Sequence, residues 1–336
     1  MQLVRLAKAT DLQDIYDLIN SGAGPAPGMT TMPKTHDEIE ERIDWSLKSI
    51  QKTNKTPNLD CYFFVLEEDQ KVIGISAIYT SVSKKDKSIF FQRSNKRIFS
   101  QSLDFIKSIE ILKLKTVNDP YTELGTLYLD SNYRGQGRGS LLSLARIKFM
   151  TLWPNRFDKK AVVEIRGKSN KDNISIFWDG FSKHFFDLDQ FDNNQMSYID
   201  NAFVAESIPD HPFVINTLKQ SVKNVIGVPH DKSFPAMRMM EGQNFKANGL
   251  IDVLDGGPSL ECKVKDLKIF KSNEIYSVNY KKNIDSTNVA LISNTKLENF
   301  IVTRSTFELA NDSIFLPQST FDLLNLKEGD KVALNV

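Results

Sequence analysis

Cysteine and histidine are scarce in this 336-residue chain, which has two cysteines, Cys61 and Cys262, and four histidines. Because these residues are few and widely spaced, the sequence contains no disulfide scaffold and no zinc-binding pattern. We therefore expect no metal site. The 43 lysines and arginines nearly balance the 42 aspartates and glutamates, so no overall field favours nucleic acid or a membrane surface. A signal-peptide pattern and an apolar run long enough to span a bilayer are also missing. The sequence therefore predicts a soluble, cytoplasmic protein.

The order of strand-like and helix-like patterns indicates the fold class. Alternating and 3.6-period apolar patterns interleave through residues 1–270, which predicts a mixed α/β (α+β) domain. From residue 271, short apolar runs separated by Asn, Asp, Gly and Pro predict a small all-β subdomain over 271–336. The length of the chain agrees with two such units.

Several local signals predict individual elements. Thr10 and Thr35 each precede an amphipathic pattern and are expected to cap helices. Residues 212–226 are expected to form a further helix. Residues 89–91 and 111–117 are weaker strand candidates, since each run is short.

The most informative segment is a strand-like run at residues 124–129 followed by a glycine-rich turn and a helical pattern. Its glycines permit positive φ angles and close approach of a ligand to backbone amides. Such amides, together with the dipole of the following helix, favour a diphosphate, and arginines add charge-assisted contacts. A plain turn before a helix is the alternative. The predicted diphosphate-binding residues are Arg134, Gly135, Gly137, Arg138 and Gly139.

This turn is neither a P-loop nor a Rossmann fingerprint, because no Gly-Lys-Ser/Thr closes it and the G-x-G-x-x-G spacing is absent. Its Arg-x-x-Gly-x-Gly spacing resembles the acyl-CoA signature of the GNAT acyltransferases. In that fold the strand before the turn parts from its neighbour, and its free backbone groups bind the pantetheine arm and polarise the thioester. The resemblance implies this role for the backbone of Leu127, whose side chain is otherwise expected in the core.

Six further stretches, in order along the chain, narrow the resemblance to the arginine N-succinyltransferase family. It implies transfer of succinyl from succinyl-CoA to the α-amino group of arginine, in arginine catabolism, with no permanently bound cofactor. It also implies that His230 is the proton donor. The stretches are residues 29–33, 123–130, 177–178 with 184–187, 203–206 with 211–212, 225–227 with His230, and 251–258 running to 261–262.

The resemblance leaves alternatives open. Residues 90–111 do not match the family pattern, and Gly-Val-Pro precedes His230 where Gly-Gln-Val is expected. Ornithine or another amine, acetyl-CoA in place of succinyl-CoA, and a catalytically silent CoA-binding subunit therefore remain possible. A homo-oligomer or a hetero-oligomer is also open, and the C-terminal β segment is one possible contact in it.

The ionisable residues can also be interpreted from their chemistry. His230 lies in a loop before a helix, and a histidine near its ordinary pKa transfers protons at neutral pH; a surface or capping histidine is the alternative. A cationic amino-acid substrate needs acidic partners, and its carboxylate needs a cation. Surface salt bridges, and for Asp255 a simple chain reversal, are the alternatives. The predicted lining residues are Glu123, Glu164, Arg166 and Asp255.

Overall fold

The computed structural model describes residues 1–20, 32–53, 55–186, 200–282, 284–310 and 313–336. Residues 29–31 and Asp187, which belong to two of the family-like stretches, lie outside the described residues. The first part of the chain contains β1 (Gln2–Leu6), η1 (Ala9–Asp11), α1 (Leu12–Asn20), α2 (His36–Gln51), β2 (Cys61–Glu68), β3 (Lys71–Val82), β4 (Ser88–Ser100), β5 (Phe105–Val117), β6 (Tyr121–Leu129), η2 (Ser131–Tyr133), α3 (Arg138–Leu152), η3 (Pro154–Arg156) and β7 (Lys160–Glu164).

The remainder adds short helices, a second group of strands and the C-terminal β segment. Its elements are α4 (Ile176–Gly180), η4 (Ser182–Phe185), α5 (Asn201–Ser207), β8 (Phe213–Val214), η6 (Ile215–Thr217), α6 (Gln220–Lys223), η7 (Asp231–Ser233), α7 (Phe234–Glu241), β9 (Lys246–Asp252), β10 (Pro258–Lys263), η8 (Val264–Asp266), α8 (Lys268–Lys271), β11 (Glu274–Tyr280), β12 (Val289–Asn294), β13 (Ile301–Thr306), β14 (Glu308–Ala310), β15 (Ser313–Leu316), α9 (Gln318–Leu323) and β16 (Lys331–Asn335).

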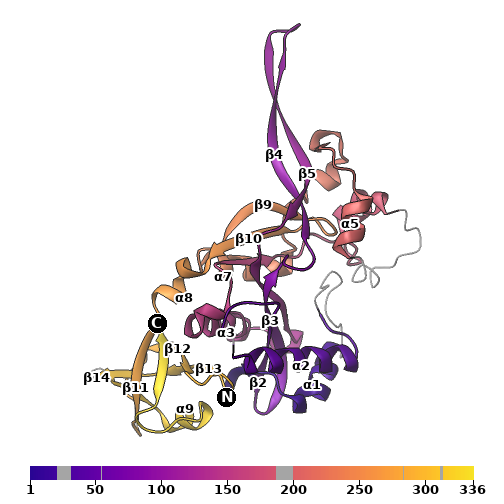
Figure 1. The fold of residues 1–336 in the computed structure, drawn as a ribbon. Helices are drawn as coiled ribbons and strands as arrows, with labels where there is room; N and C mark the ends of the chain where they lie inside the picture. The colour runs from indigo at the N-terminus through magenta and orange to yellow at the C-terminus, as the bar shows by residue number, and fades with distance from the viewer. Residues whose placement is uncertain (21–31, 54, 187–199, 283, 311–312) are drawn as a thin grey trace.

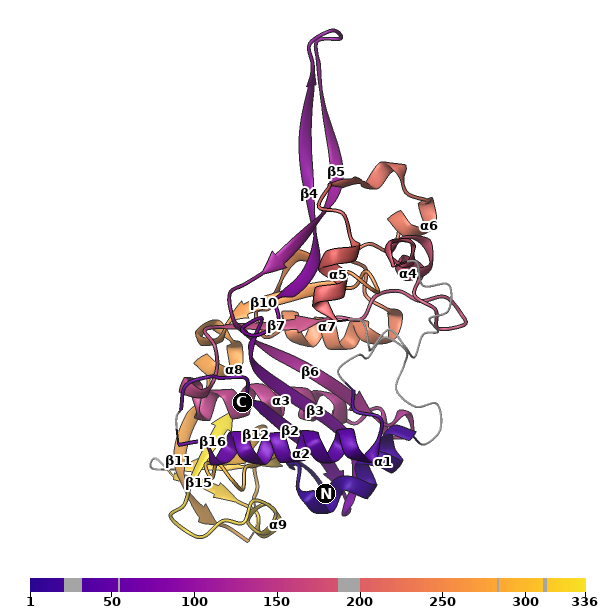
Figure 2. The same cartoon turned by 45° about the vertical axis from the view of Figure 1, so that its right-hand side comes forward.

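The described strands are hydrogen-bonded in one continuous order, β14-β15-β11-β16-β12-β13-β1-β2-β3-β6-β7-β10-β9-β4-β5-β8. Strand β2 shows why the centre of this sheet is buried on both faces. Cys61, Phe63 and Val65 pack in the cluster that contains the apolar side chains of α1 and α2. Tyr62, Phe64 and Leu66 face the opposite way, into the cluster that contains α3. Helices therefore cover both faces of the central strands, as Figure 2 shows.

The two predicted helix caps have different outcomes. Thr35 caps α2 as expected, because its hydroxyl accepts a hydrogen bond from the Glu38 N–H while the Glu38 carboxylate accepts one from the Thr35 N–H. Thr10 is not a cap. Asp11 closes the start of η1 instead, because its Oδ2 accepts a hydrogen bond from the Lys8 N–H at 2.7 Å. The same carboxylate pairs with Arg5.

The two weak strand candidates belong to the most extended feature of the molecule. Strands β4 and β5 pair antiparallel along their full lengths, from Ser88↔Val117 to Ser100↔Phe105. Only their bases join the sheet, through β9 and β8, and the remainder projects away from the body (Figures 1 and 2). The sequence indicated only short strands here because residues 93–99 and 101–108 are exposed on both faces and show no buried alternation.

The helix predicted over residues 212–226 is wrong. This segment contains β8, η6 and the short helix α6. Phe213 pairs with Leu112 of β5 and packs its ring against Phe91, Phe181 and Phe185, so tertiary contacts hold the backbone extended.

The C-terminal β segment is attached to the rest of the chain through its strands and one buried lysine. β13 pairs with β1, at Val4↔Val302 and Arg5↔Ile301. From α3, the fully buried Lys148 donates to Asn273 Oδ1 and Asn335 Oδ1, each at 2.6 Å. Burial lowers the pKa of Lys148 well below its ordinary value. None of the described helices combines the length and apolar character needed to cross a membrane.

We predict that Lys148→Ala lowers the free energy of unfolding by about 3 kcal/mol, because it leaves two asparagine oxygens unpaired and a cavity behind. Urea unfolding measures the change. The exposed Lys265 offers a matched control, and Lys265→Ala should stay within about 0.5 kcal/mol of the wild type. Equal stabilities of the two variants would contradict this role for Lys148.

Candidate active site

The site begins where β6 parts from its parallel neighbour β7. The two strands pair only at Thr122↔Ala161 and Glu123↔Val162. From Leu124 onward β6 remains paired with β3 alone, so the edge of β6 that faces β7 is unpaired by that strand. This is the parting of strands that the GNAT resemblance implied, and it includes Leu127. The Leu127 side chain is half-buried against the main core. The part of Leu127 that lies on the open edge is therefore its backbone.

A bulge shapes the same strand. The pairing of β6 with β3 shifts register between Gly125 and Tyr128, where Thr126 has a φ of 47°. The Thr126 hydroxyl lies 2.7 Å from the Tyr79 hydroxyl, which also accepts a hydrogen bond from Arg42. The guanidinium of Arg42 stacks over the Tyr79 ring, 5.1 Å from its centroid. These contacts from β3 and α2 hold the bulged backbone in place.

The glycine-rich turn follows at the end of β6. Gly135, Gln136 and Gly137 all have positive φ angles, of 100°, 48° and 72°, and α3 begins at Arg138. Gly139 lies in the first turn of that helix. Successive left-handed residues before a helix N-terminus direct backbone N–H groups toward one place, which is the geometry of an anion site.

The two arginines of the turn are in different environments. Arg138 forms a two-bond ion pair with Glu68, at 2.6 and 2.8 Å, and lies over the ring of Tyr133. This pairing raises the pKa of Arg138 and lowers the pKa of Glu68. Arg134, in contrast, is exposed. The turn therefore holds one arginine already neutralised by a carboxylate and one that extends into solvent.

A third arginine, which the sequence interpretation missed, reaches the turn from the C-terminal segment. Arg304 of β13 donates to the Gly137 carbonyl oxygen at 3.1 Å and to the Ser140 hydroxyl at 2.8 Å. A Cβ at residue 137 would lie 2.2 Å from its guanidinium, so a side chain there would displace Arg304, while the φ of 72° itself favours glycine. Partial withdrawal from water lowers the pKa of Arg304, and no carboxylate among the described residues opposes that shift.

His230 lies in a loop that is fastened to the end of β7. Its N–H donates to the Arg166 carbonyl oxygen at 2.8 Å, and the preceding Pro229 bridges Gly167. Its Nδ1 accepts the Lys232 N–H at 3.1 Å, which places the proton of the neutral ring on Nε2. Burial, followed by the charge of Arg166, lowers the pKa of His230. The ring is therefore neutral at physiological pH, with Nε2–H available as a donor.

Glu123 is the last residue of β6 that pairs with β7, and it is influenced by two arginines that the sequence interpretation also missed. Burial raises its pKa to about 7, while Arg42 and Arg146 act in the opposite direction. Arg146 is fully buried on α3, where it donates to the Gly125 carbonyl oxygen at 3.0 Å. Burial lowers the pKa of Arg146 to about 10. A charged residue in the apolar run of this helix is the sequence signal that identifies it.

The remaining predicted lining residues join this group from β7 and from the turn between β9 and β10. Glu164 keeps exposed surface, but the protein packed around its carboxyl, followed by the charges of Glu123, Asp252 and Asp255, raises its pKa well above the ordinary value. Burial, followed by Asp252, raises the pKa of Asp255 to about 7. Arg166 is half-buried, and burial lowers its pKa while Asp255 opposes that shift.

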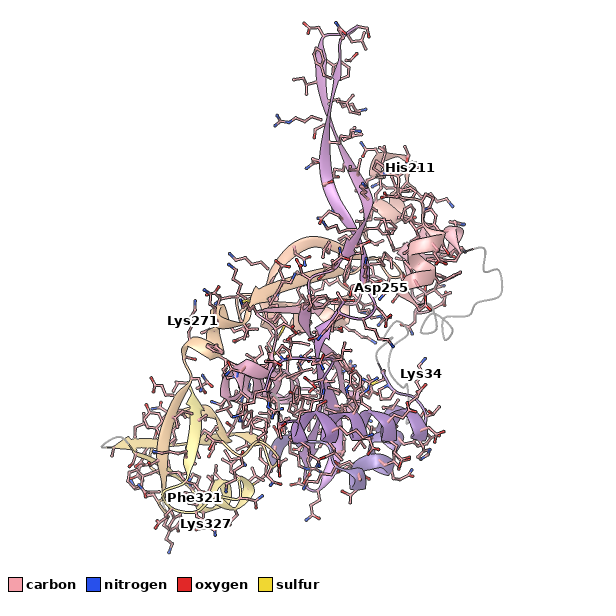
Figure 3. The ribbon with its side chains drawn as sticks, in the orientation of Figure 1. Lys34, His211, Asp255, Lys271, Phe321 and Lys327 are labelled. Carbon is pink, nitrogen blue, oxygen red and sulfur yellow. The ribbon has the colours of Figure 1, made fainter. Side chains whose placement is uncertain are left out.

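Asp255 lies at the centre of the molecule (Figure 3) and also serves the backbone. Its two oxygens accept the N–H groups of Gly167 and Gly257, at 2.8 and 2.7 Å. The predicted chain reversal is thus present, and the same carboxylate contributes negative charge to the group formed with Glu123, Glu164 and Asp252.

These parts occupy successive positions along β6. The carboxylates gather around its beginning, the open edge follows, and the glycine turn lies at its end. Leu127 is four residues from Glu123, about 13 Å along an extended strand. A phosphorylated thioester lying along the strand, with a separate amine beside the carboxylates, would fit this order of glycine turn, open edge and carboxylates.

Comparison with known proteins agrees with this arrangement. The family model described as "Arginine N-succinyltransferase beta subunit" matches residues 2–269, and the model of its C-terminal domain matches residues 278–334. The chain belongs to the arginine N-succinyltransferase family. Arginine N-succinyltransferase of Yersinia pestis is 30% identical over 99% of this chain and 97% of its own length, and that of Shigella sonnei is 29% identical over the same shares.

A solved structure confirms the fold. Arginine/ornithine succinyltransferase subunit AI from Pseudomonas aeruginosa superimposes with a TM-score of 0.86 at 24% identity, covering 99% of this chain and 98% of its own. The expected mixed α/β class with C-terminal strands is therefore confirmed, as is the expectation of an acyltransferase.

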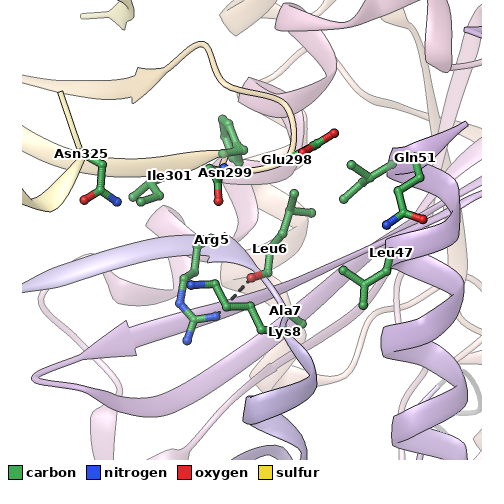
Figure 4. A pocket seen from close by; sticks show the side chains of 12 residues that line it. Arg5, Leu6, Ala7, Lys8, Leu47, Gln51, Glu298, Asn299, Ile301 and Asn325 are labelled. Carbon is green, nitrogen blue, oxygen red and sulfur yellow. Dashed lines mark hydrogen bonds between the residues drawn. The ribbon is translucent and has the colours of Figure 1, made fainter. Parts of the chain in front are cut away.

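One pocket of the described structure lies apart from the predicted site residues. A pocket between β1, α2 and residues 298–301 (Figure 4) is lined by side chains such as Lys8, Leu47 and Glu298. Within the described ranges, no group of three or more His, Cys, Asp or Glu side chains has an arrangement that could hold a metal ion.

The raised pKa of Glu123 can be tested through stability. Above its ordinary value of 4.5 the unfolded carboxyl ionises, whereas the folded one stays protonated until about 7. The free energy of unfolding should therefore fall as the pH rises across that range. Glu123→Gln removes this contribution, so its stability relative to the wild type should increase from about pH 5 to about pH 8, by a few kcal/mol at most.

Urea unfolding at a series of pH values measures this difference. The matched control is Glu241→Gln on the exposed surface of α7, which should follow the pH dependence of the wild type. A Glu123→Gln difference that does not vary with pH would contradict the raised pKa.

Proposed function

We propose that this protein transfers a succinyl group from succinyl-CoA to the α-amino group of arginine, the first step of arginine catabolism by that route. The observation that carries the proposal is the open edge of β6, with the glycine turn at one end and the carboxylates at the other, in a member of this family. Ornithine is the second candidate acceptor, since the similar Pseudomonas aeruginosa protein is an arginine/ornithine succinyltransferase subunit by name.

The turn and the strand would hold the acyl donor. Backbone N–H groups of Gly135, Gly137 and Gly139 would bind the diphosphate, with Arg134 as an added cation. The backbone at Leu127 would bind the pantetheine arm and polarise the thioester carbonyl, since donors aimed at the developing oxyanion stabilise it. Arg138 would act indirectly, because its ion pair with Glu68 positions the first turn of α3.

The carboxylates would hold and activate the acceptor. Glu123, with a pKa of about 7, is suited to remove a proton from the ammonium group of the substrate. The neutral amine nitrogen then attacks the thioester carbon, the C–N bond forms, and the C–S bond breaks to release the CoA thiolate. The second proton that the nitrogen loses on becoming an amide passes to solvent, which supplies the proton that the thiolate gains. Glu164 and Asp255 would bind the guanidinium group, whose positive charge would lower their raised pKa values and so favour their ionised forms. Arg166 would bind the substrate carboxylate.

His230 would act on the leaving thiolate through Nε2–H. Full proton transfer from a neutral ring would leave an imidazolate, so the ring must first gain a proton or donate a hydrogen bond only. Protonation at Nδ1 would break the bond from the Lys232 N–H. We therefore propose stabilisation of the thiolate by hydrogen bonding, completed by proton exchange with solvent.

The test is release of free thiol from succinyl-CoA with a panel of amines. We expect turnover with arginine or ornithine, and slower turnover with acetyl-CoA as donor. His230→Asn keeps a side-chain oxygen that can accept the Lys232 N–H but removes Nε2–H, so it should lower kcat and leave CoA affinity unchanged. No thiol release with either amine while CoA still binds would favour a silent CoA-binding subunit. Full activity in His230→Asn would instead contradict the role of His230.

We also propose that Arg304 binds a phosphate of the donor, because it is held at an anion-binding helix N-terminus without a carboxylate partner among the described residues. Arg304→Ala should raise KM for succinyl-CoA about 10-fold or more, the value of one charge-assisted hydrogen bond. Succinyl-pantetheine lacks phosphates, so with this donor the variant should match the wild type.

The exposed Lys327 provides the control, and Lys327→Ala should leave both donors unaffected. Succinyl-dephospho-CoA separates contact with the 3′-phosphate from contact with the diphosphate. Equal losses with succinyl-CoA and succinyl-pantetheine would mean that Arg304 only supports the fold.

Two further expectations from the sequence remain predictions. They are the division of the chain into residues 1–270 and 271–336, and the cytoplasmic location.

A further inference from the structure

The projecting part of the β4–β5 hairpin, residues 93–108, is here called the arm. Every described residue of the arm except Ser100 is exposed. Two strands alone are only marginally stable in water, because neither face has a layer to pack on. The arm therefore has the properties of an element that is completed by contact with another surface.

The tip of the arm is apolar. Of the fifteen large hydrophobic side chains exposed in the described residues, five lie within residues 98–106, with exposures from 43% to 72%. Phe99 stands directly opposite Ile106 on one face, and Ile98 and Phe105 lie on the other. The five exposed apolar residues of the tip are Ile98, Phe99, Leu103, Phe105 and Ile106. A cluster of this kind marks a contact surface rather than a chance exposure.

The hairpin is also basic. Residues 88–117 contain six lysines and arginines and two carboxylates. Arg93 is paired with Glu110 at 2.7 Å, and Lys113 lies 3.6 Å from Asp210. Lys96, Arg97 and Lys107 form no ion pair with any other described residue. The arm therefore presents free positive charge beside its apolar tip, which favours an acidic partner.

The opposite end of the molecule presents such a surface. Helices α1 and α2 together contain seven carboxylates against two basic residues. On α2 the exposed acids follow helical spacing along one stripe, and no described cation pairs with them. The acidic face consists of Asp14, Asp17, Asp37, Glu40, Glu41 and Asp44. Beside it Trp45, 38% exposed, offers an apolar contact for the tip.

We propose that the arm docks on the acidic face of a second copy of this chain. The arm and the acidic face lie at opposite ends of the molecule (Figure 1), so they cannot meet within one chain. Two antiparallel copies would exchange both contacts about a twofold axis, which closes the assembly. The sizes agree, since the eight residues of β4 in the arm, 93–100, span about 25 Å and the 16-residue α2 about 24 Å.

Charge exchange between the two surfaces tests the pairing. The arm variant is Lys96→Glu/Arg97→Glu/Lys107→Glu, and the face variant is Glu40→Lys/Glu41→Lys/Asp44→Lys. Light scattering after size exclusion should give twice the mass of one chain for the wild type and a single-chain mass for each variant alone. An equimolar mixture of the two variants should again give the double mass, because each arm then meets a face of opposite charge.

Controls separate this contact from general effects of charge or apolar exposure. Lys265→Glu/Lys268→Glu/Lys282→Glu changes the same number of charges elsewhere and should leave the dimer intact. Phe99→Ser/Ile106→Ser should weaken it, whereas Leu309→Ser, at another exposed apolar position, should not. A single-chain mass for the wild type, a dimer that survives either charge variant, or a mixture that stays at single-chain mass would each overturn the proposal.

Discussion

The parting of β6 from β7 after Glu123 is the constraint on which the rest of the site depends. Two residue pairs join these parallel strands, and beyond them none of the described strands lies along that edge of β6. An open edge inside a sheet is costly unless something satisfies it. The bulge at Thr126, held by Tyr79 and Arg42, fixes the backbone of β6 along this edge. The same backbone can then satisfy its hydrogen bonds with a ligand that has amide and carbonyl groups of its own.

The charges around that edge are arranged at the expense of stability. Glu123 lies between two arginines, yet burial and not attraction sets the direction of its pKa. Arg146, in the core of α3, carries a similar desolvation cost and is compensated by the Gly125 carbonyl oxygen and the Ser143 hydroxyl. Groups whose pKa values are moved toward neutrality by such burial are suited to proton transfer. The fold therefore tolerates unfavourable electrostatics at the place where the proposed reaction would use Glu123 as a base.

The sequence predicted those features whose signals are local. Thr35 with Glu38, the period-2 pattern of β6 and the glycine-rich turn each specify their structure within a few residues, and each is where it was expected. The prediction that Thr10 caps a helix was wrong. Asp11, the next residue, accepts the Lys8 N–H and also pairs with Arg5, so it stabilises the start of the helix instead. The 212–226 segment was wrong because ring contacts from distant segments decide its conformation. The contact of Arg304 with Gly137 joins positions 167 residues apart, and no spacing rule connects them.

That distant contact changes how the C-terminal β segment should be regarded. β13 extends the sheet from β1, Lys148 reaches two asparagines that flank the segment, and Arg304 returns to the first turn of α3. Removing the segment would therefore expose the β1 edge, leave the buried Lys148 amine without its partners, and take away a cation at the glycine turn, all at once. A loss of activity after such a deletion would not distinguish binding from folding. Only single-residue changes combined with donors that lack phosphate can show whether the segment contributes to binding as well as to stability.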